Sequence, residues 1–509
     1  MRVRAVLGRV GLPATLGELT SRRWDVVVVG GGHNGLAAAA YLALAGRSVL
    51  VLERREAIGG ACTLERPFAD PGYQVSPCAY VIGLLHHLVV EELDLRRHGY
   101  RVHPIDPHLW CPFEDGTSLS LWDEPDRSAA AVALLSPGDV DGYRAYEEIF
   151  LRIRQALRSP IRDTWVGPAP QRDELEALLG HDREAVEVLF ESSIAEVVER
   201  HVTDERLRTA LHGQGIIGTW AGPRDPGTAA IHAFHAMGTL DGRAGAWGFV
   251  SGGAGQVSFA LAEAAIEAGA TVASGVPVSA IAPGEGVRLE GGEFVRAQVV
   301  VSNADAQRTL ELCEGEVPVE FEARVRSWNS LGCVVKVNCG LTRLPRFSAA
   351  SDGEPGRGMV TVSSGIDSTQ AAYVASRRGE PAPDWCELYL QTVYDPSVAP
   401  PGRHLVSVFA QYAPYVLAQG SWEERRGSAS PAGTSSRGNA CPTRCGTGAS
   451  AHAPRFPGST CAARPPIREE ASSPSTDETR RWRCWRISGT ETSDPTVGRC
   501  AIRRSPITR

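Results

Sequence analysis

The sequence predicts an α/β protein with two lobes. Its 509 residues exceed what a single hydrophobic core usually fills. A strand–helix–strand pattern with closely spaced glycines occupies residues 25–53, and long helical and strand-like blocks follow it. The balance of 43% hydrophobic and 22% charged residues is typical of a folded globular chain. A largely disordered or membrane-spanning chain would have a different composition.

The first element is a strand rich in valine, which ends at a glycine-rich turn. Four consecutive valines, 26–29, are typical of a parallel strand that is covered on both faces. The pattern Gly30-x-Gly32-x-x-Gly35 follows directly and includes Gly31. In such a pattern the first glycine permits a tight turn, the second lets the backbone approach a pyrophosphate, and the third lets a helix pack on the strand.

A helix and a second strand complete the unit. An alanine-rich helix is predicted from about Asn34 to Gly46, and its N-terminal N–H groups would face the phosphates. Strand 48–52 ends at Glu53, which lies 18 residues past Gly35. A carboxylate at that position can accept both hydroxyls of an adenosine ribose. Strand, glycines, helix, strand and acid in this order predict a Rossmann-like dinucleotide-binding lobe.

The residues after Glu53 indicate which dinucleotide binds. Gly59-Gly60 permits the backbone to pass close to a phosphate, and Arg54 is a candidate to neutralise its charge. Arg54 and Arg55 are equally typical of a solvated surface pair. The run Glu-Arg-x-x-x-x-Gly-Gly after a Rossmann unit resembles the FAD-binding signature of the flavin amine oxidase and phytoene desaturase superfamily. This resemblance implies an FAD cofactor.

Cys62 follows the glycine pair and invites comparison with a redox dithiol. In pyridine nucleotide–disulfide reductases, a similar Gly-Gly leads into two cysteines that are separated by four residues. The second of these positions is Pro67 here. Dithiol chemistry is therefore disfavoured, and we expect Cys62 to be a small packed side chain.

A second glycine cluster, 245–255, precedes a predicted helix over 256–268. Strands are predicted at 271–272, 276–281 and 297–301, and the last runs into Ser-Asn-Ala-Asp. This order resembles the return of the chain from the substrate domain in the same superfamily, and the resemblance implies a discontinuous FAD lobe in which Val278 contacts adenine. A plain βαββ insertion is the alternative.

The resemblance spans residues 24–426. The stretches 33–36, 246–248 and 399–404 resemble the phytoene dehydrogenase-related branch of the superfamily most. It implies an FAD-dependent oxidoreductase that desaturates or dehydrogenates a hydrophobic small molecule, such as a polyisoprenoid or carotenoid, by hydride transfer to the flavin. A non-catalytic nucleotide-binding or regulatory protein on the same fold is the alternative. An amine oxidase is disfavoured, because no aromatic pair for an amine cage is evident.

The intervening segments predict a substrate lobe of helices and an antiparallel sheet. Amphipathic stretches at 172–180 and 183–199 predict helices, and 333–337 and 405–409 predict strands. The sequence assigns no catalytic residue and no metal ligand. The histidines that are candidates for a general base by residue type alone are His86, His87, His212, His232 and His235.

The predicted division of the chain has six parts. They are an N-terminal arm (1–23), the FAD lobe (24–110 and 241–310), the substrate lobe (helical part 111–240, sheet part 311–426) and a low-complexity tail (427–509).

The tail differs sharply from the rest of the chain. Residues 427–509 hold 13 arginines, 6 acidic residues and no leucine, so they cannot bury enough apolar surface to offset the entropy of ordering. Three interpretations stand: a natural disordered arm, a metal or disulfide module built on Cys441, Cys445 and His452, and a shifted reading frame. The frameshift is favoured, because the resemblance implies a C-terminal glycine-rich strand–turn–helix beside the flavin and nothing after Arg426 matches it. We therefore expect this polypeptide to hold FAD poorly.

Charge and hydropathy limit the partners and the cellular location that can be expected for this protein. The net charge of −7 offers no overall basic field for nucleic acid. The longest apolar run, 36–46, has 11 residues against the roughly 18 that span a bilayer, which leaves only contact with a membrane surface. Five arginines within 1–23 fit a transit peptide, an over-extended start or a flexible arm. The cysteines before the tail lack paired spacing, which favours the reducing cytoplasm.

Overall fold

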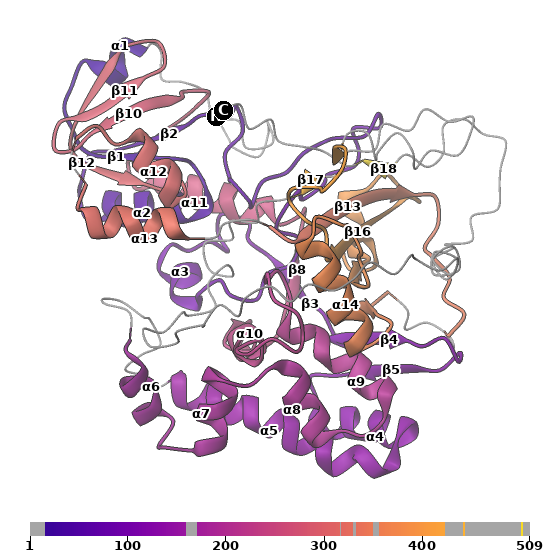
Figure 1. Cartoon of the computed structure of the whole chain (residues 1–509). Coiled ribbons are helices and arrows are strands. Elements are labelled where there is room, and N and C mark those ends of the chain that lie inside the picture. The colour runs from indigo at the N-terminus through magenta and orange to yellow at the C-terminus, as the bar shows by residue number, and fades with distance from the viewer. Residues whose placement is uncertain are drawn as a thin grey trace.

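The computed structural model describes residues 16–158, 170–315, 317–328, 332–349 and 356–422, and the backbone of 441–442 and 500–501. The expectations for residues 1–15 and for the tail, apart from the backbone of these four residues, lie outside the described residues. Within the predicted N-terminal arm, α1 (Leu16–Thr20) packs on the first strand, because the indole N–H of Trp24 donates to the carbonyl of Leu19 at 2.9 Å. Figure 1 shows three groups of elements: a sheet with flanking helices, a second sheet, and a layer of helices.

The first sheet is Rossmann-like. Its strand order is β10-β11-β12-β1-β2-β9, in which β12, β1, β2 and β9 are parallel and β10 and β11 are antiparallel additions. The strands are β1 (Trp24–Val29), β2 (Val49–Glu53), β9 (Thr271–Ser274), β10 (Val278–Ala282), β11 (Gly286–Leu289) and β12 (Phe294–Ser302). Valines 26–29 of β1 are buried, as expected for a strand covered on both faces.

Helices α2 (His33–Leu44) and α11 (Gly255–Glu267) pack together against this sheet, and their alanines allow close approach. Strands of one sheet come from residues 24–53 and 271–302, so the discontinuous Rossmann-like lobe is confirmed. Helix α2 begins at His33, one residue before its predicted start at about Asn34, because Gly32 is its N-cap. The other short helices near this lobe are α3 (His87–Glu92), α12 (Ala306–Leu312) and α13 (Val319–Ser327).

The second sheet is mainly antiparallel, as predicted. Along its main path the order is β17-β13-β16-β15-β14-β4-β5, with β18 also paired to β13, and only the β14–β4 pair is parallel. The strands are β4 (Leu109–Pro112), β5 (Ser118–Leu121), β13 (Val334–Leu341), β14 (Met359–Val362), β15 (Trp385–Tyr389), β16 (His404–Gln411), β17 (Cys441–Pro442) and β18 (Cys500–Ala501).

Strands β4 and β5 make one difference from the predicted organisation. They belong to the second sheet, although the sequence predicts mainly helix from residue 111, and the predicted boundary between residues 110 and 111 falls inside β4. In β5, Leu119 and Leu121 are buried while Ser118 and Ser120 are half-buried. This alternation is the period-2 pattern of a strand, and four residues were too short for the sequence to reveal it.

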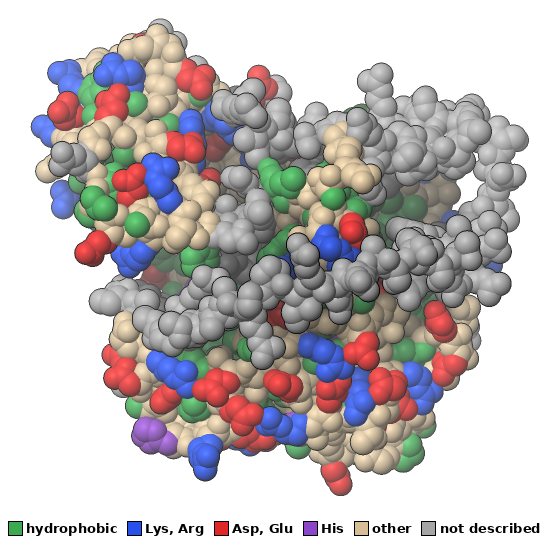
Figure 2. Space-filling view, viewed as in Figure 1, with side chains coloured by type: hydrophobic (Ala, Val, Ile, Leu, Met, Phe, Trp, Pro, Cys, Tyr) green, Lys and Arg blue, Asp and Glu red, His purple; other side chains and the backbone are tan. Residues whose placement is uncertain are grey.

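The helical layer covers one face of the second sheet (Figure 1). Its helices are α4 (Pro125–Leu135), α5 (Val140–Leu157), α6 (Arg172–Leu178), α7 (Arg183–Phe190), α8 (Ile194–His201), α9 (Glu205–Leu211) and α10 (Ala229–His235), and α14 (Ile366–Arg377) lies beside the sheet. The stretch 183–199, predicted as one helix, is two, because Ser193 and Glu196 form a capping box that starts α8. Figure 2 shows acidic and basic side chains interspersed over these helices.

Two small strand pairs lie outside the two large sheets. Strand β3 (Val102–Pro104) pairs with β8 (Gly248–Val250), and β6 (Thr239–Leu240) pairs with β7 (Arg243–Ala244). A single bridge joins Ile82 to Gly248. In the described part of the chain, none of the helices has both the length and the apolarity that a bilayer crossing requires.

Candidate functional site

The glycine loop 30–35 lies at the carboxyl edge of the parallel strands. Gly30 has a φ of +103°, which favours glycine, and its N–H donates to the carbonyl of Leu52 at 2.8 Å. Gly32 is the N-cap of α2, where no side chain of the described residues caps the helix and the first turn holds no acid. The positive end of the α2 dipole is therefore available to an anion.

Glu53 lies against this loop at the end of β2. Its side chain is buried, Oε2 accepts the N–H of Gly31 at 2.8 Å, and Oε1 accepts the N–H of Arg55 at 2.9 Å. Each carboxylate oxygen retains a further lone pair for a ligand. The two hydrogen bonds fix the carboxylate at the place where the sequence predicts an acid for a ribose.

The second glycine pair lies directly beside the first loop. Gly59 donates its N–H to the carbonyl of Gly31 at 2.7 Å, and Gly59 forms a parallel bridge with Gly32. Gly59 and Gly60 have φ values of +112° and +58°. From α11, the hydroxyl of Ser258 donates to the carbonyl of Gly59 at 3.4 Å. The two glycine segments, 30–35 and 59–60, thus lie side by side. Together they are called the glycine strip below.

The two arginines after Glu53 have different surroundings. The side chain of Arg54 is exposed, and no hydrogen bond or ion pair between described residues joins it to the glycine strip. Arg55 is half-buried, with Nη2 donating to the carbonyl of Gly60 at 3.0 Å and Nε lying 3.9 Å from Glu53 Oε1. Of the pair, Arg55 therefore stands at the glycine strip.

Val278 lies on the segment that follows β9 and bonds the end of β2. It begins β10, is half-buried and packs on the core under the β10–β12 extension. Two residues earlier, the N–H of Val276 donates to the carbonyl of Glu53 at 2.9 Å. The structure therefore brings the Val278 segment next to the end of β2.

Asn303 belongs to the Ser-Asn-Ala-Asp run noted in the sequence, but no role at this site was predicted for it. Its backbone N–H donates to the carbonyl of Val29 at 2.8 Å, and Nδ2 donates to the carbonyl of Gly30 at 3.2 Å. The available signal was its place directly after β12, because adjacent parallel strands end at the same edge of a sheet.

His33 is a second residue that was missed. It starts α2 between Gly32 and Gly35, and its Nδ1 is buried without a hydrogen-bond partner among the described residues. Burial lowers the pKa of His33 below its ordinary value. Its position within the glycine pattern was the signal.

The second glycine cluster forms a turn that connects the lobes. Gly252 and Gly253 have positive φ values of +77° and +95°. The N–H of Gly252 donates to Asp395 Oδ2 at 2.6 Å, and the N–H of Ala254 donates to the hydroxyl of Ser76 at 3.0 Å. The turn before α11 is thereby held by side chains from two distant segments.

The five candidate histidines lie apart from the glycine strip. His86 caps α3 and stacks on His87, with ring centroids 4.5 Å apart. His212, His232 and His235 belong to the helical layer, and burial lowers their pKa values to about 4, about 3 and about 4. His212 Nε2 lies 3.1 Å from Thr369 Oγ1, and His232 Nδ1 lies 2.8 Å from the Tyr146 hydroxyl, so each of these two rings has a hydrogen-bond partner.

The glycine strip fits a dinucleotide. A Cβ at Gly32 would lie 2.7 Å from Asn303 Nδ2, and one at Gly35 would lie 2.5 Å from the carbonyl oxygen of Gly30. Only glycine leaves this backbone bare for a phosphate. Within the described ranges, no His, Cys, Asp and Glu side chains group as a metal site would require.

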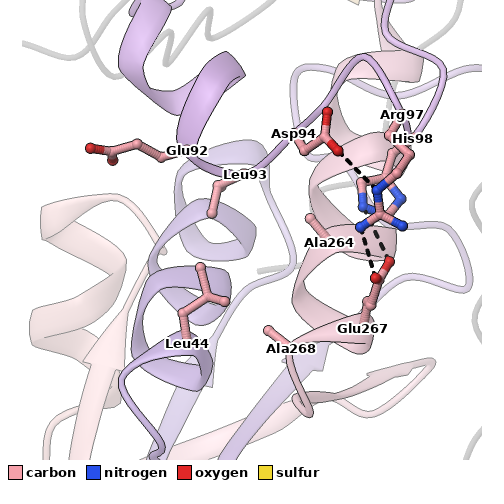
Figure 3. A pocket seen from close by; sticks show the side chains of 9 residues that line it. All are labelled: Leu44, Glu92, Leu93, Asp94, Arg97, His98, Ala264, Glu267 and Ala268. Atoms are coloured by element: carbon pink, nitrogen blue, oxygen red, sulfur yellow. Dashed lines mark hydrogen bonds and ion pairs between the residues drawn. The ribbon is translucent and has the colours of Figure 1, made fainter.

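A cavity of about 220 Å³ opens elsewhere, on the outer face between α2, α3 and α11 (Figure 3). Arg97 there bonds both Asp94 and Glu267, at 2.9 and 2.7 Å. The cavity contains none of the glycines, so it is separate from the dinucleotide site.

Comparison with known proteins identifies relatives over most of the chain. Residues 28–86 match the family model of the NAD(P)-binding Rossmann-like domain. The mouse protein named pyridine nucleotide-disulfide oxidoreductase domain-containing protein 2 is 33% identical over 442 residues, which cover 79% of this chain and 76% of that protein. An uncharacterised protein of Mycobacterium tuberculosis is 30% identical over 77% of this chain and 75% of its own length.

Two further similarities are weaker. The 4,4'-diaponeurosporene oxygenase of Staphylococcus aureus is 26% identical over 295 residues, 56% of each chain. The solved structure of a putrescine oxidase double mutant, with 18% identity and a TM-score of 0.50, covers 80% of this chain and 79% of that one. The second similarity shows a shared fold only.

Proposed function

We propose that this chain, which belongs to the family of pyridine nucleotide-disulfide oxidoreductase domain-containing protein 2, dehydrogenates a hydrophobic small molecule with FAD. It is an oxidoreductase with a Rossmann-like dinucleotide lobe. The observation that carries the proposal is the contact between the two glycine segments, through Gly59 and Gly31, beside a buried Glu53. A simple NAD-binding unit lacks the second glycine pair.

In this proposal each part of the site has one task. Backbone N–H groups of Gly30, Gly31, Gly32 and Gly35 hold the pyrophosphate, and Glu53 accepts the adenosine ribose hydroxyls. Gly59 and Gly60 adjoin the phosphate on the flavin side, Val278 contacts the adenine, and Arg54 together with Arg55 supplies positive charge. FAD, when bound, supplies the hydride acceptor.

The substrate lobe supports a hydrophobic substrate. On the face of the second sheet that carries Glu387, Tyr389 packs against Tyr80 and Phe249, with ring centroids 4.6 and 6.2 Å apart. Phe409 lies 6.0 Å from Tyr80 in the same group. These rings form an apolar, largely buried group next to the segment that follows the glycine strip, and we propose that an apolar substrate binds beside them. The name of the staphylococcal relative, a diaponeurosporene oxygenase, favours an isoprenoid or carotenoid.

The proposed roles of the two lobes are those that the sequence predicts. Residues 24–110 and 241–310 are proposed to bind the cofactor, while 111–240 and 311–426 are proposed to shape the substrate site. The proposed location is the cytoplasm, without nucleic acid as a partner.

The test of this function is flavin binding followed by flavin reduction. The full chain is purified, its flavin content is measured by absorbance, and the loaded protein is mixed anaerobically with a carotenoid precursor. Bleaching of the flavin with a stoichiometric dehydrogenated product supports the proposal. Bound flavin that no carotenoid precursor reduces favours the non-catalytic alternative, and binding of NAD in place of FAD contradicts the cofactor assignment.

The tail also affects the flavin content that we expect for the purified chain. Because no segment after Arg426 resembles the flavin-closing element of the superfamily, we propose that the tail arises from a shifted reading frame and that FAD occupancy is low. The nucleotide sequence tests this directly: one of the other two frames after the Arg426 codon should encode a patterned, glycine-rich segment. If neither frame does, or if the purified chain carries stoichiometric flavin, the proposal is wrong.

A further inference from the structure

Four side chains form one row across the second sheet, on the face that meets the helical layer. Lys336 of β13 is opposite Phe409 of β16, Phe409 is opposite Glu387 of β15, and Glu387 is opposite Thr361 of β14. Residues directly opposite each other in neighbouring strands place their side chains on the same face. The row therefore sets an acid beside a hydroxyl at one end.

Glu387 and Thr361 are enclosed and incompletely bonded. Their exposed fractions are 1% and 0%. The hydroxyl of Tyr389 lies 2.6 Å from Glu387 Oε2. Neither Glu387 Oε1 nor Thr361 Oγ1 has a hydrogen-bond partner among the residues that the structure describes. Buried polar atoms without partners cost free energy, so two of them on opposite residues indicate a group that completes them.

The surroundings of the pair are apolar and lie between the lobes. Tyr389, which bonds Glu387, also approaches Met359 Sδ at 2.9 Å and packs on Tyr80 of the segment that follows the glycine strip. At the other end of the row, the Lys336 ammonium donates to the carbonyl of Cys78 at 3.0 Å and lies 4.1 Å from the Tyr80 ring centre. The lysine charge is thus directed to that segment and not to Glu387.

The charge state of Glu387 limits what can bind. Burial raises the pKa of Glu387 to about 8, so the carboxyl is neutral near pH 7 and both donates and accepts hydrogen bonds. A cationic ligand would require an ionised, desolvated partner, and an anionic ligand would meet the neutral carboxyl, since the cation of this row, Lys336, lies at its other end. A neutral hydroxyl can donate to one of the two atoms and accept from the other.

We infer that Glu387 and Thr361 form a binding site for the hydroxyl group of a hydrophobic alcohol, within the substrate region of the dehydrogenase proposed above. This site makes the enzyme select an oxygenated apolar molecule over its hydrocarbon counterpart. The selection arises because the hydrocarbon leaves two buried polar atoms without partners.

The test compares two probes of matched shape. Geraniol and its deoxygenated counterpart, 2,6-dimethylocta-2,6-diene, are titrated into the full chain, and binding is followed by calorimetry. We expect geraniol to bind about tenfold more tightly. Thr361→Val, which keeps the side-chain shape, should abolish that difference, Glu387→Leu should do the same, and Thr361→Ser should retain it.

Three outcomes overturn the inference. Equal affinity for the two probes in the parent chain shows that the two atoms hold a buried water only. A preference for geraniol that persists in Thr361→Val places the alcohol site elsewhere, and failure of both probes to bind rules the site out. The titration needs neither FAD nor turnover, so a chain that fails the flavin-reduction test but passes this one separates the two proposals.

Discussion

The carboxylate of Glu53 accepts the backbone N–H of Gly31 across the edge of two parallel strands, with 2.8 Å between Oε2 and N. The two residues are 22 positions apart in the chain, and their contact joins the end of β2 to the first glycine loop. The carboxylate is therefore oriented before any ligand arrives, which reduces the entropic cost of binding.

Replacing Glu53 with Gln should weaken FAD binding by about ten- to a hundredfold, because the amide replaces one of two charged acceptors for the ribose hydroxyls. Titration of the apo-protein with FAD, followed by flavin fluorescence, measures the effect. Glu56→Gln, at an exposed position three residues on, serves as the control and should bind like the parent chain. Equal affinities for the parent and Glu53→Gln would contradict the assigned role.

A methyl group at Gly32 should block the phosphate site. The Cβ of Gly32→Ala would lie 2.7 Å from Asn303 Nδ2, so the asparagine must move and the carbonyl of Gly30 loses its donor. We expect FAD affinity to fall by more than about tenfold. At Gly138 the structure shows open space and no positive φ, so Gly138→Ala is a matched control that should leave binding unchanged.

A double variant tests the cause of this loss. If the steric clash with Asn303, and not the loss of its hydrogen bond to Gly30, is responsible, then Asn303→Ala combined with Gly32→Ala should recover part of the affinity. Unchanged binding in Gly32→Ala alone would mean that the pyrophosphate does not approach this backbone.

The Rossmann-like lobe was predictable because its signals are local. Four consecutive valines, three spaced glycines and an acid at the end of the next strand each constrain a backbone that tolerates few alternatives. Strand β5 was not predicted, because its four residues carry little periodicity and it gains its stability from pairing with β4. The break between α7 and α8 depends on a capping box that spans only Ser193 to Glu196.

The candidate site was predictable where a short motif or a family resemblance identifies its residues. Gly30 to Gly35 and Glu53 were found by spacing and Val278 by resemblance, whereas no role was predicted for Asn303, which reaches the carbonyl of Gly30 from 273 residues away. Glu387 and Thr361 carry no sequence signal at all, because their significance arises from cross-strand register and burial. Long-range pairing of this kind requires the structure.

The buried histidines should make the protein sensitive to acid. The pKa of His235 falls to about 4 through burial, so its contribution to stability is present above the ordinary value of 6.5 and is lost as pH falls from 6.5 towards 4. His235→Phe keeps an aromatic ring against Trp247, whose centroid is 5.8 Å away. We expect the variant to lose less thermal stability than the parent between pH 6.5 and 4.

Melting temperatures by circular dichroism over this pH range measure the difference. His181→Asn, at an exposed turn, is the control and should follow the parent curve. Parallel curves for the parent and His235→Phe would show that another group causes the acid sensitivity.

Glu387 should make the protein less stable at high pH, whereas the buried histidines do so at low pH. Burial raises its pKa from 4.5 to about 8, so the folded state prefers the protonated carboxyl. The corresponding stability is fully present below about pH 4.5 and is lost as pH rises through 8. The difference is on the order of 4 kcal/mol, and Glu387→Gln, which stays neutral, should melt at least about 5 °C above the parent at pH 9. At pH 5 the two proteins should melt at nearly the same temperature.

The melting curves need a matched exposed acid as a reference. Glu205→Gln removes a carboxylate whose side chain is 80% exposed and should change the melting temperature equally at pH 5 and pH 9. A Glu387→Gln variant that gains no stability between these pH values would show that the carboxyl ionises without penalty. In that case a counter-charge reaches it, and a neutral Glu387 carboxyl could not serve with Thr361 as the alcohol site.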